Sequence, residues 1–137
     1  NDGSALKKFA EFVEAQGGDS APVYDTKLLP QASIVKEVYA PVDGYVSHIE
    51  SDRVGISAMK LGGGRETKES PIDLSVGILI NKKVGNKVEK GEKIATLYAN
   101  DGEKLAAAIT ELEQAYSYSV TPVEKPKLIK TVIGTAE

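Results

Sequence analysis

A strict alternation of apolar residues between positions 72 and 80 constrains the fold more than any other feature of this sequence. Apolar side chains take every second position, at Ile72, Leu74, Val76, Ile78 and Ile80. Because successive side chains of a β-strand point to opposite faces of a sheet, the segment is predicted to be a strand with one wholly apolar face. We therefore expect a strand-rich region around it.

Further strands and helices are predicted on both sides of this segment. Strand patterns occur at residues 34–40, 45–50, 87–89, 94–98 and 127–135. A helix is predicted at 51–61, with Ser51 or Asp52 as the N-cap, and another from Asn100, which forms a capping-box pattern with Glu103. The elements mix without regular βαβ alternation. The predicted class is therefore α+β, a small, mixed and barrel-like β-sheet with flanking helices.

The N-terminal residues are predicted to lie outside this sheet-containing domain. The segment 4–16 has apolar residues at helical spacing, Ser4 as its candidate N-cap and a pair of glycines at its end. Residues 19–32 contain two prolines and little periodicity, which indicates an extended linker. We therefore divide the chain into a helix with linker, residues 1–32, and an α+β domain, residues 33–137.

The composition excludes several kinds of site and partner. Cysteine is absent, which excludes disulfides and cysteine-based metal sites, and His48 is the only histidine, interpreted as an ordinary strand residue. The net charge of −3 gives no basic surface for nucleic acid. The apolar runs are far shorter than the about 20 residues that span a membrane. A local lysine surplus is interpreted as a solvated strand edge, at Lys82, Lys83, Lys87, Lys90 and Lys93.

Three consecutive glycines followed by an arginine form the main candidate site. The backbone N–H groups of Gly62, Gly63 and Gly64, beside the guanidinium of Arg65, can hold a phosphate or a carboxylate. The loop follows a predicted helix and lacks the P-loop sequence, so a nucleotide-binding fingerprint is not indicated. Three interpretations remain open: a structural loop, a direct anion contact, and a loop that moves when a neighbouring domain closes.

A lysine just before these glycines suggests an alternative. Ala58-Met59-Lys60-Leu61 is similar to the tetrapeptide on which biotin-carrier domains are modified, and Val88-Glu-Lys-Gly-Glu92 resembles the Val-x-x-Gly-x pattern of biotinyl and lipoyl domains. In carriers this second pattern precedes the modified lysine, whereas here it follows Lys60. Lys60 is also predicted to end a helix rather than occupy a hairpin. The alternative function is therefore a carrier module modified at Lys60.

The order of motifs around the glycines resembles another family over nearly the whole chain. A helix leads into Leu61-Gly-Gly-Gly-Arg65, and Ile72-Asp-Leu-Ser-Val-Gly77 follows. Ala15-Gln-Gly-Gly-Asp19, the run 82–92 and the segment 127–130 continue the similarity. Together these motifs resemble the C-terminal domain of the thymidine and pyrimidine-nucleoside phosphorylases.

This resemblance implies a domain of the α/β-hammerhead type, with residues 1–32 coming from the α/β domain of a longer parent. The parent reaction would be the reversible phosphorolysis of uridine or thymidine by a cytoplasmic homodimer, with a potassium ion in bacterial members. The family's catalytic, phosphate-binding and base-binding motifs lie upstream. No catalytic, substrate-binding or metal-binding residue is therefore carried over, and the fragment alone is expected to be inactive and monomeric.

The segment that the resemblance does transfer is Gly62–Arg65, which matches a family loop that orders when the active-site cleft closes. The expected role of this domain is thus to support that cleft and its closure. Because the chain begins with Asn1 rather than Met, we expect it to be a piece of a larger protein whose remainder is its partner.

Overall fold

The structure, a computed structural model, describes residues 2–65 and 67–134. The helical elements are α1 (Ser4–Ala15), α2 (Ala21–Tyr24), η1 (Thr26–Leu28), α3 (Ser51–Ala58), η2 (Met59–Gly63) and α4 (Gly102–Ala115). The strands are β1 (Ile34–Tyr39), β2 (Gly44–Ile49), β3 (Gly77–Ile80), β4 (Lys87–Val88), β5 (Lys93–Ala99) and β6 (Tyr116–Ser119). The predicted α+β class is confirmed.

The described strands form two antiparallel sheets, in the orders β1-β5-β3 and β4-β2-β6. β1 and β2 follow each other closely in the sequence but belong to different sheets, so the turn at 41–43 passes the chain from one sheet to the other. The central strand β5 carries buried residues on both faces, which include Ile94, Ala95 and Leu97. It therefore forms the middle of the core.

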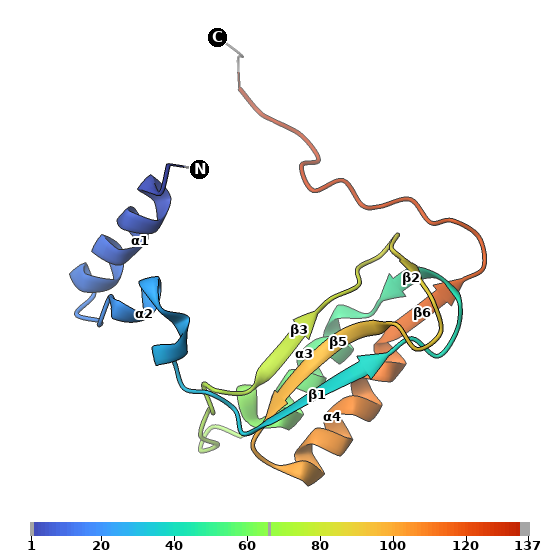
Figure 1. The fold of residues 1–137 in the computed structure, drawn as a ribbon, viewed down its shortest axis with the longest axis horizontal. Helices are drawn as coiled ribbons and strands as arrows, with labels where there is room; N and C mark the ends of the chain where they lie inside the picture. Colours follow the sequence, from blue (N-terminus) through green and yellow to red (C-terminus); the bar gives the residue numbers. More distant parts are fainter. Residues whose placement is uncertain (1, 66, 135–137) are drawn as a thin grey trace.

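Helices α3 and α4 cover one side of the sheets and pack on each other (Figure 1). The apolar stripe of α4 supplies Leu105, Ala108 and Leu112 to the core. Ser57 of α3 is fully buried, and its hydroxyl donates a hydrogen bond to the backbone carbonyl of Ala108 at 2.7 Å. A small side chain at this position allows the two helices to approach closely while its polar atom stays satisfied.

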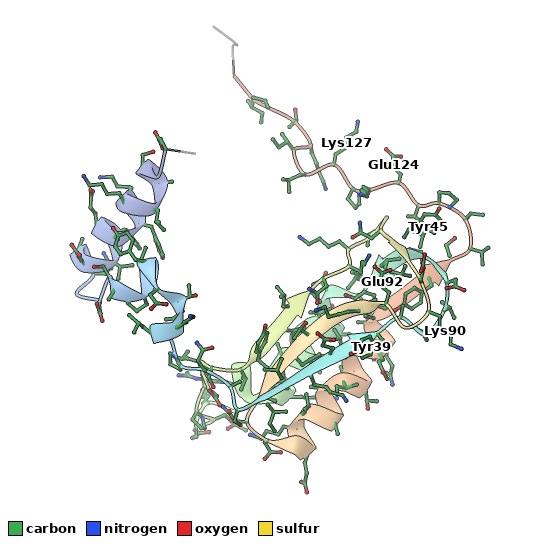
Figure 2. All side chains as sticks on the ribbon, in the orientation of Figure 1. Tyr39, Tyr45, Lys90, Glu92, Glu124 and Lys127 are labelled. Carbon is green, nitrogen blue, oxygen red and sulfur yellow. The ribbon has the colours of Figure 1, made fainter. Side chains whose placement is uncertain are left out.

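The N-terminal helices and the C-terminal segment both extend away from the sheets. α1 and α2 stand apart from the strands in Figure 1, and Phe9 and Phe12 of α1 are more than half exposed. The segment after β6 leaves the strands, as the labels of Glu124 and Lys127 in Figure 2 show. The short helices α2 and η1 occupy part of the segment predicted to be an extended linker.

Two strand predictions differ from the structure. Only Gly77–Ile80 of the alternating segment is a strand, because the Asp73 side chain accepts the backbone N–H of Ser75 at 2.9 Å and forms a turn that competes with strand pairing. Leu74 is consequently 82% exposed. The strand predicted at 127–135 is wrong for residues 127–134, which pair with none of the described strands; Thr135 lies outside the described residues.

The predicted helix N-caps are each displaced by one or two residues. α1 is capped by Gly3 rather than Ser4, and α3 by Glu50 rather than Ser51 or Asp52. Asp101, rather than Asn100, caps α4, since its carboxylate accepts the backbone N–H groups of Glu103 and Lys104 at 2.8 and 3.0 Å. Strand β6 was not predicted, because its four residues follow α4 without a turn signal.

Candidate functional site

The glycine loop is the end of a helix that changes its winding. α3 continues directly into η2, a π-helical segment, and Gly62 within it has a φ of 102°. π-helical turns are uncommon and frequently occur at functional sites. Because a Cβ makes positive φ costly, Gly62 is the residue in this loop whose backbone requires glycine.

The other two glycines are needed for space rather than for their backbone angles. A Cβ on Gly63 would lie 3.2 Å from the carbonyl oxygen of Ala58, and one on Gly64 would lie 3.3 Å from the Cβ of Met59. A side chain at either position would therefore press the loop away from the helix that precedes it.

The loop is attached to the domain on its inner side. Leu61 is buried in the core, and the Gly62 carbonyl accepts the backbone N–H of Asp73 at 2.9 Å. A hollow of about 300 Å³ lies beside it, lined by Leu61, Gly62, Pro71, Ile72, Asp73, Asn100, Asp101 and Lys104. The loop is therefore anchored at Gly62, while Arg65 lies beyond the anchor.

Arg65 is exposed at the outer end of the loop. Within residues 2–65 and 67–134, its side chain makes no hydrogen bond or ion pair, whereas Arg53 of α3 contacts both Glu50 and Glu111. A guanidinium held near an exposed loop can form charge-assisted hydrogen bonds to a carboxylate or phosphate that approaches from outside.

A hydrogen-bonded cluster lies directly behind the loop. The Asp73 carboxylate accepts the Ser75 hydroxyl at 2.7 Å and the Asn100 amide at 2.8 Å. These two hydrogen bonds, with a third from the Ser75 backbone N–H, lower the pKa of Asp73 below its ordinary value. The positive charge of Lys104 acts in the same direction. Asp73 is thus an ionised anchor rather than a proton donor or base at neutral pH.

The sequence did not reveal this cluster. The strand predicted around residues 72–80 would place Asp73 on its polar face, and Asn100 was expected at a helix N-cap. The structure instead brings both side chains together with Ser75. The only available signal was the pair Asn100-Asp101, because one of two adjacent capping residues is free for another partner.

Lys60 lies on the π-helical segment and not on a hairpin. Its ammonium group contacts Glu111 of α4 at 2.7 Å, and Arg53 contacts the other oxygen of the same carboxylate at 2.7 Å. The Glu111 side chain is only 14% exposed. This pairing holds Lys60 against α4, which is unfavourable for modification by a ligase that needs a protruding lysine.

His48 was interpreted from the sequence as an ordinary strand residue. His48 is exposed on β2, opposite Ser117 of β6. In the described part of the chain, no group of three or more His, Cys, Asp or Glu side chains is placed to hold a metal ion. Within the same residues no helix has both the length and the apolar character to cross a membrane.

The fold and the loop together define an α+β domain that presents a glycine-terminated helix end at its surface. The family model described as "Pyrimidine nucleoside phosphorylase C-terminal domain" matches residues 45–119, which include both sheets in part, α3, α4 and the whole loop. The chain belongs to this family.

Proteins from three named organisms match most of the chain. The protein from Geobacillus stearothermophilus named pyrimidine-nucleoside phosphorylase is 50% identical over 93% of this chain and 29% of its own length. The protein of that name from Bacillus subtilis is 48% identical over 96% of this chain and 30% of its own length. A third, from Staphylococcus aureus, is 47% identical over 73% of this chain and 23% of its own length. The chain thus spans less than a third of the length of these relatives.

Proposed function

We propose that this chain is the C-terminal domain of a pyrimidine-nucleoside phosphorylase and that it supports one wall of the active-site cleft. The observation that carries the proposal is the 50% identity over 93% of the chain to a protein of that name. The parent would convert a pyrimidine nucleoside, uridine or thymidine, and phosphate into the base and (deoxy)ribose 1-phosphate. It would be a cytoplasmic homodimer, with any potassium ion bound upstream of this domain.

The role in closure follows from the chemistry of phosphorolysis. Phosphate attacks a ribosyl carbon that has oxocarbenium character, and water at the same position would give free sugar instead. A domain that closes over the cleft excludes that water, and such closure often limits turnover. In this proposal Gly62–Arg65 contacts the opposite wall when the cleft closes.

The anchoring of the loop supports this role. Gly62 is fixed by the N–H of Asp73 and by the buried Leu61, so the domain can position the loop as a rigid unit. Arg65 lies outside the anchor and is exposed, which leaves its guanidinium available to an acceptor across the cleft.

A domain exchange tests the proposal. The matching segment of the Geobacillus stearothermophilus phosphorylase is replaced by this chain, and release of uracil from uridine is measured in phosphate buffer. We expect the chimaera to release uracil and ribose 1-phosphate, whereas this chain alone and a phosphorylase lacking the segment stay at the level of the blank. A folded, dimeric chimaera without activity, or turnover by the chain alone, would contradict the proposal.

A further inference from the structure

The strand register places Ser33, at the start of the sheet-containing domain, opposite Asn100 of the cluster behind the glycine loop. Ile34 of β1 pairs with Ala99 of β5, so the next residues outward, Ser33 and Asn100, face each other. The backbone N–H of Ser33 donates a hydrogen bond to Oδ1 of Asn100 at 2.8 Å. Ser33 is the first residue after the predicted linker, so Asn100 holds the chain where the linker enters the domain.

The other end of the same amide contacts the cluster that anchors the loop. Nδ2 of Asn100 donates to Oδ2 of Asp73 and to the Ser75 hydroxyl, each at 2.8 Å. The backbone N–H of Asp73 then donates to the Gly62 carbonyl. A continuous series of hydrogen bonds therefore runs from Ser33 through Asn100 and Asp73 to the glycine loop.

The chemistry of the series requires an amide at position 100. The Ser33 N–H can only donate, and the ionised carboxylate of Asp73 can only accept, so the residue between them must offer one acceptor and one donor at the same distance from its backbone. Asparagine does this. An aspartate would place a second carboxylate against Asp73. An alanine would leave the Ser33 N–H and the Asp73 carboxylate without this hydrogen-bond partner.

We propose that Asn100 is a positioning residue that couples the entry of the linker at Ser33 to the position of the loop Gly62–Arg65. Movement of the linker changes the Ser33–Asn100 hydrogen bond, and Asn100 transmits the change to Asp73 and so to Gly62. The inference deepens the proposed function, because it assigns the contact through which a change in the orientation of the preceding domain reaches the closure loop.

Amide hydrogen exchange of this chain, followed residue by residue by NMR, tests the coupling without any nucleoside. Ser33→Pro removes the donor, and Ser33 precedes the first residue of β1, so the change takes no N–H from the pairing of β1 with β5. We expect it to accelerate exchange of the Asp73 amide by about fivefold, and Asn100→Ala to accelerate the Ser33 and Asp73 amides by about tenfold, as the loss of a hydrogen bond predicts. Asn86→Ala is the matched control, since the side chain of Asn86 accepts the N–H of Lys83 in a turn.

The double variant separates coupling from general loosening. In an Asn100→Ala background, Ser33→Pro should have no further effect on the Asp73 amide, because the residue that connects them is gone. Since coupling is reciprocal, Asp73→Ala should accelerate exchange at Ser33, and this readout serves if Ser33→Pro does not fold. An Asp73 amide unaffected by Ser33→Pro, or equal effects from Asn86→Ala, would overturn the inference. Because no substrate is involved, this result is independent of whether the chimaera is active.

Discussion

Gly55 and Gly62 lie on the same helical segment and have opposite backbone requirements. Gly62 has a φ of 102°, whereas Gly55 lies inside α3, outside the left-handed region, and a Cβ added there meets no atom within 4 Å. We expect Gly62→Ala to destabilise the chain by about 1–2 kcal/mol, the cost of a Cβ in a left-handed conformation. Gly55→Ala should stabilise it by about 1 kcal/mol, through helix propensity.

Urea denaturation of the two variants and the parent chain measures both effects. The two changes add the same methyl group within one helical segment, so each is the control for the other. Equal stability of the Gly62→Ala and Gly55→Ala variants would show that the backbone at Gly62 relaxes and that glycine is not required there.

Arg65→Ala is another single-residue change, but its expected effect is on turnover rather than on stability. In the chimaeric phosphorylase we expect it to lower kcat about ten- to a hundredfold, the loss of one charge-assisted hydrogen bond that forms only in the closed state. Removal of this exposed side chain should change stability by no more than about 0.5 kcal/mol. Lys68→Ala, an exposed cation close by in the sequence, is the control. Steady-state kinetics with uridine and thermal melts give both values, and an unchanged kcat would reduce the loop to a connector.

At the scale of elements, α1 has little support from the rest of the chain. Leu6, Phe9 and Phe12 are 48, 53 and 60% exposed, although Ala10 is buried. We therefore expect the amides of α1 to exchange much faster than those of β5, because local opening exposes little additional apolar surface. In the proposed parent this face would pack on the preceding domain.

Hydrogen exchange of a dilute monomer tests this expectation, with α4 as an internal control because its apolar stripe is buried. Protection of residues 5–15 equal to that of β5 would mean that α1 packs stably on its own domain.

The sequence predicted elements well where a hydrophobic pattern coincided with burial. Four elements were predicted with bounds within a few residues of the observed ones, because each places one or two apolar faces against the core. These elements are β1, β2, β5 and α4. The alternation at 72–76 predicted a strand that does not form there, since alternation cannot report that Asp73 bonds to Ser75 and Gly62. The glycine loop itself was predicted from its residues, but the cluster behind it depends on the contact of Asp73 with Asn100, which are 27 residues apart.

At the scale of the whole molecule, acid should destabilise the fold. Hydrogen bonds and neighbouring positive charges lower the pKa of Glu37, Asp73, Glu92, Asp101 and Glu111. A carboxylate whose folded pKa lies below its unfolded value stabilises the fold fully above the unfolded pKa, about 4. That stability is lost as the pH falls through the folded pKa. The melting temperature should therefore stay level from neutral pH to about pH 5 and fall below it.

Glu111→Gln isolates one contribution to this acid sensitivity. The hydrogen bond from Lys60 is the largest cause of the lowered pKa of Glu111, and the variant removes the charge that Lys60 and Arg53 share. We expect a lower melting temperature at pH 7 and a smaller loss on acidification than in the parent chain. Glu113→Gln, at an exposed position of the same helix, is the control. Identical acid dependence in the two variants would show that the Glu111 cluster does not contribute.

After β1 the chain crosses from one sheet to the other, and this crossing affects the order of folding during synthesis. Ile34 pairs with Ala99, and Tyr45 pairs with both Lys87 and Ser119, so neither β1 nor β2 has all its long-range partners until much of the domain has been made. Such distant pairings slow folding, and unpaired strand edges invite association between growing chains. On the ribosome this domain therefore closes late, once β5 and β6 have left the exit tunnel. Any part of the protein that precedes β1 has that interval in which to fold first.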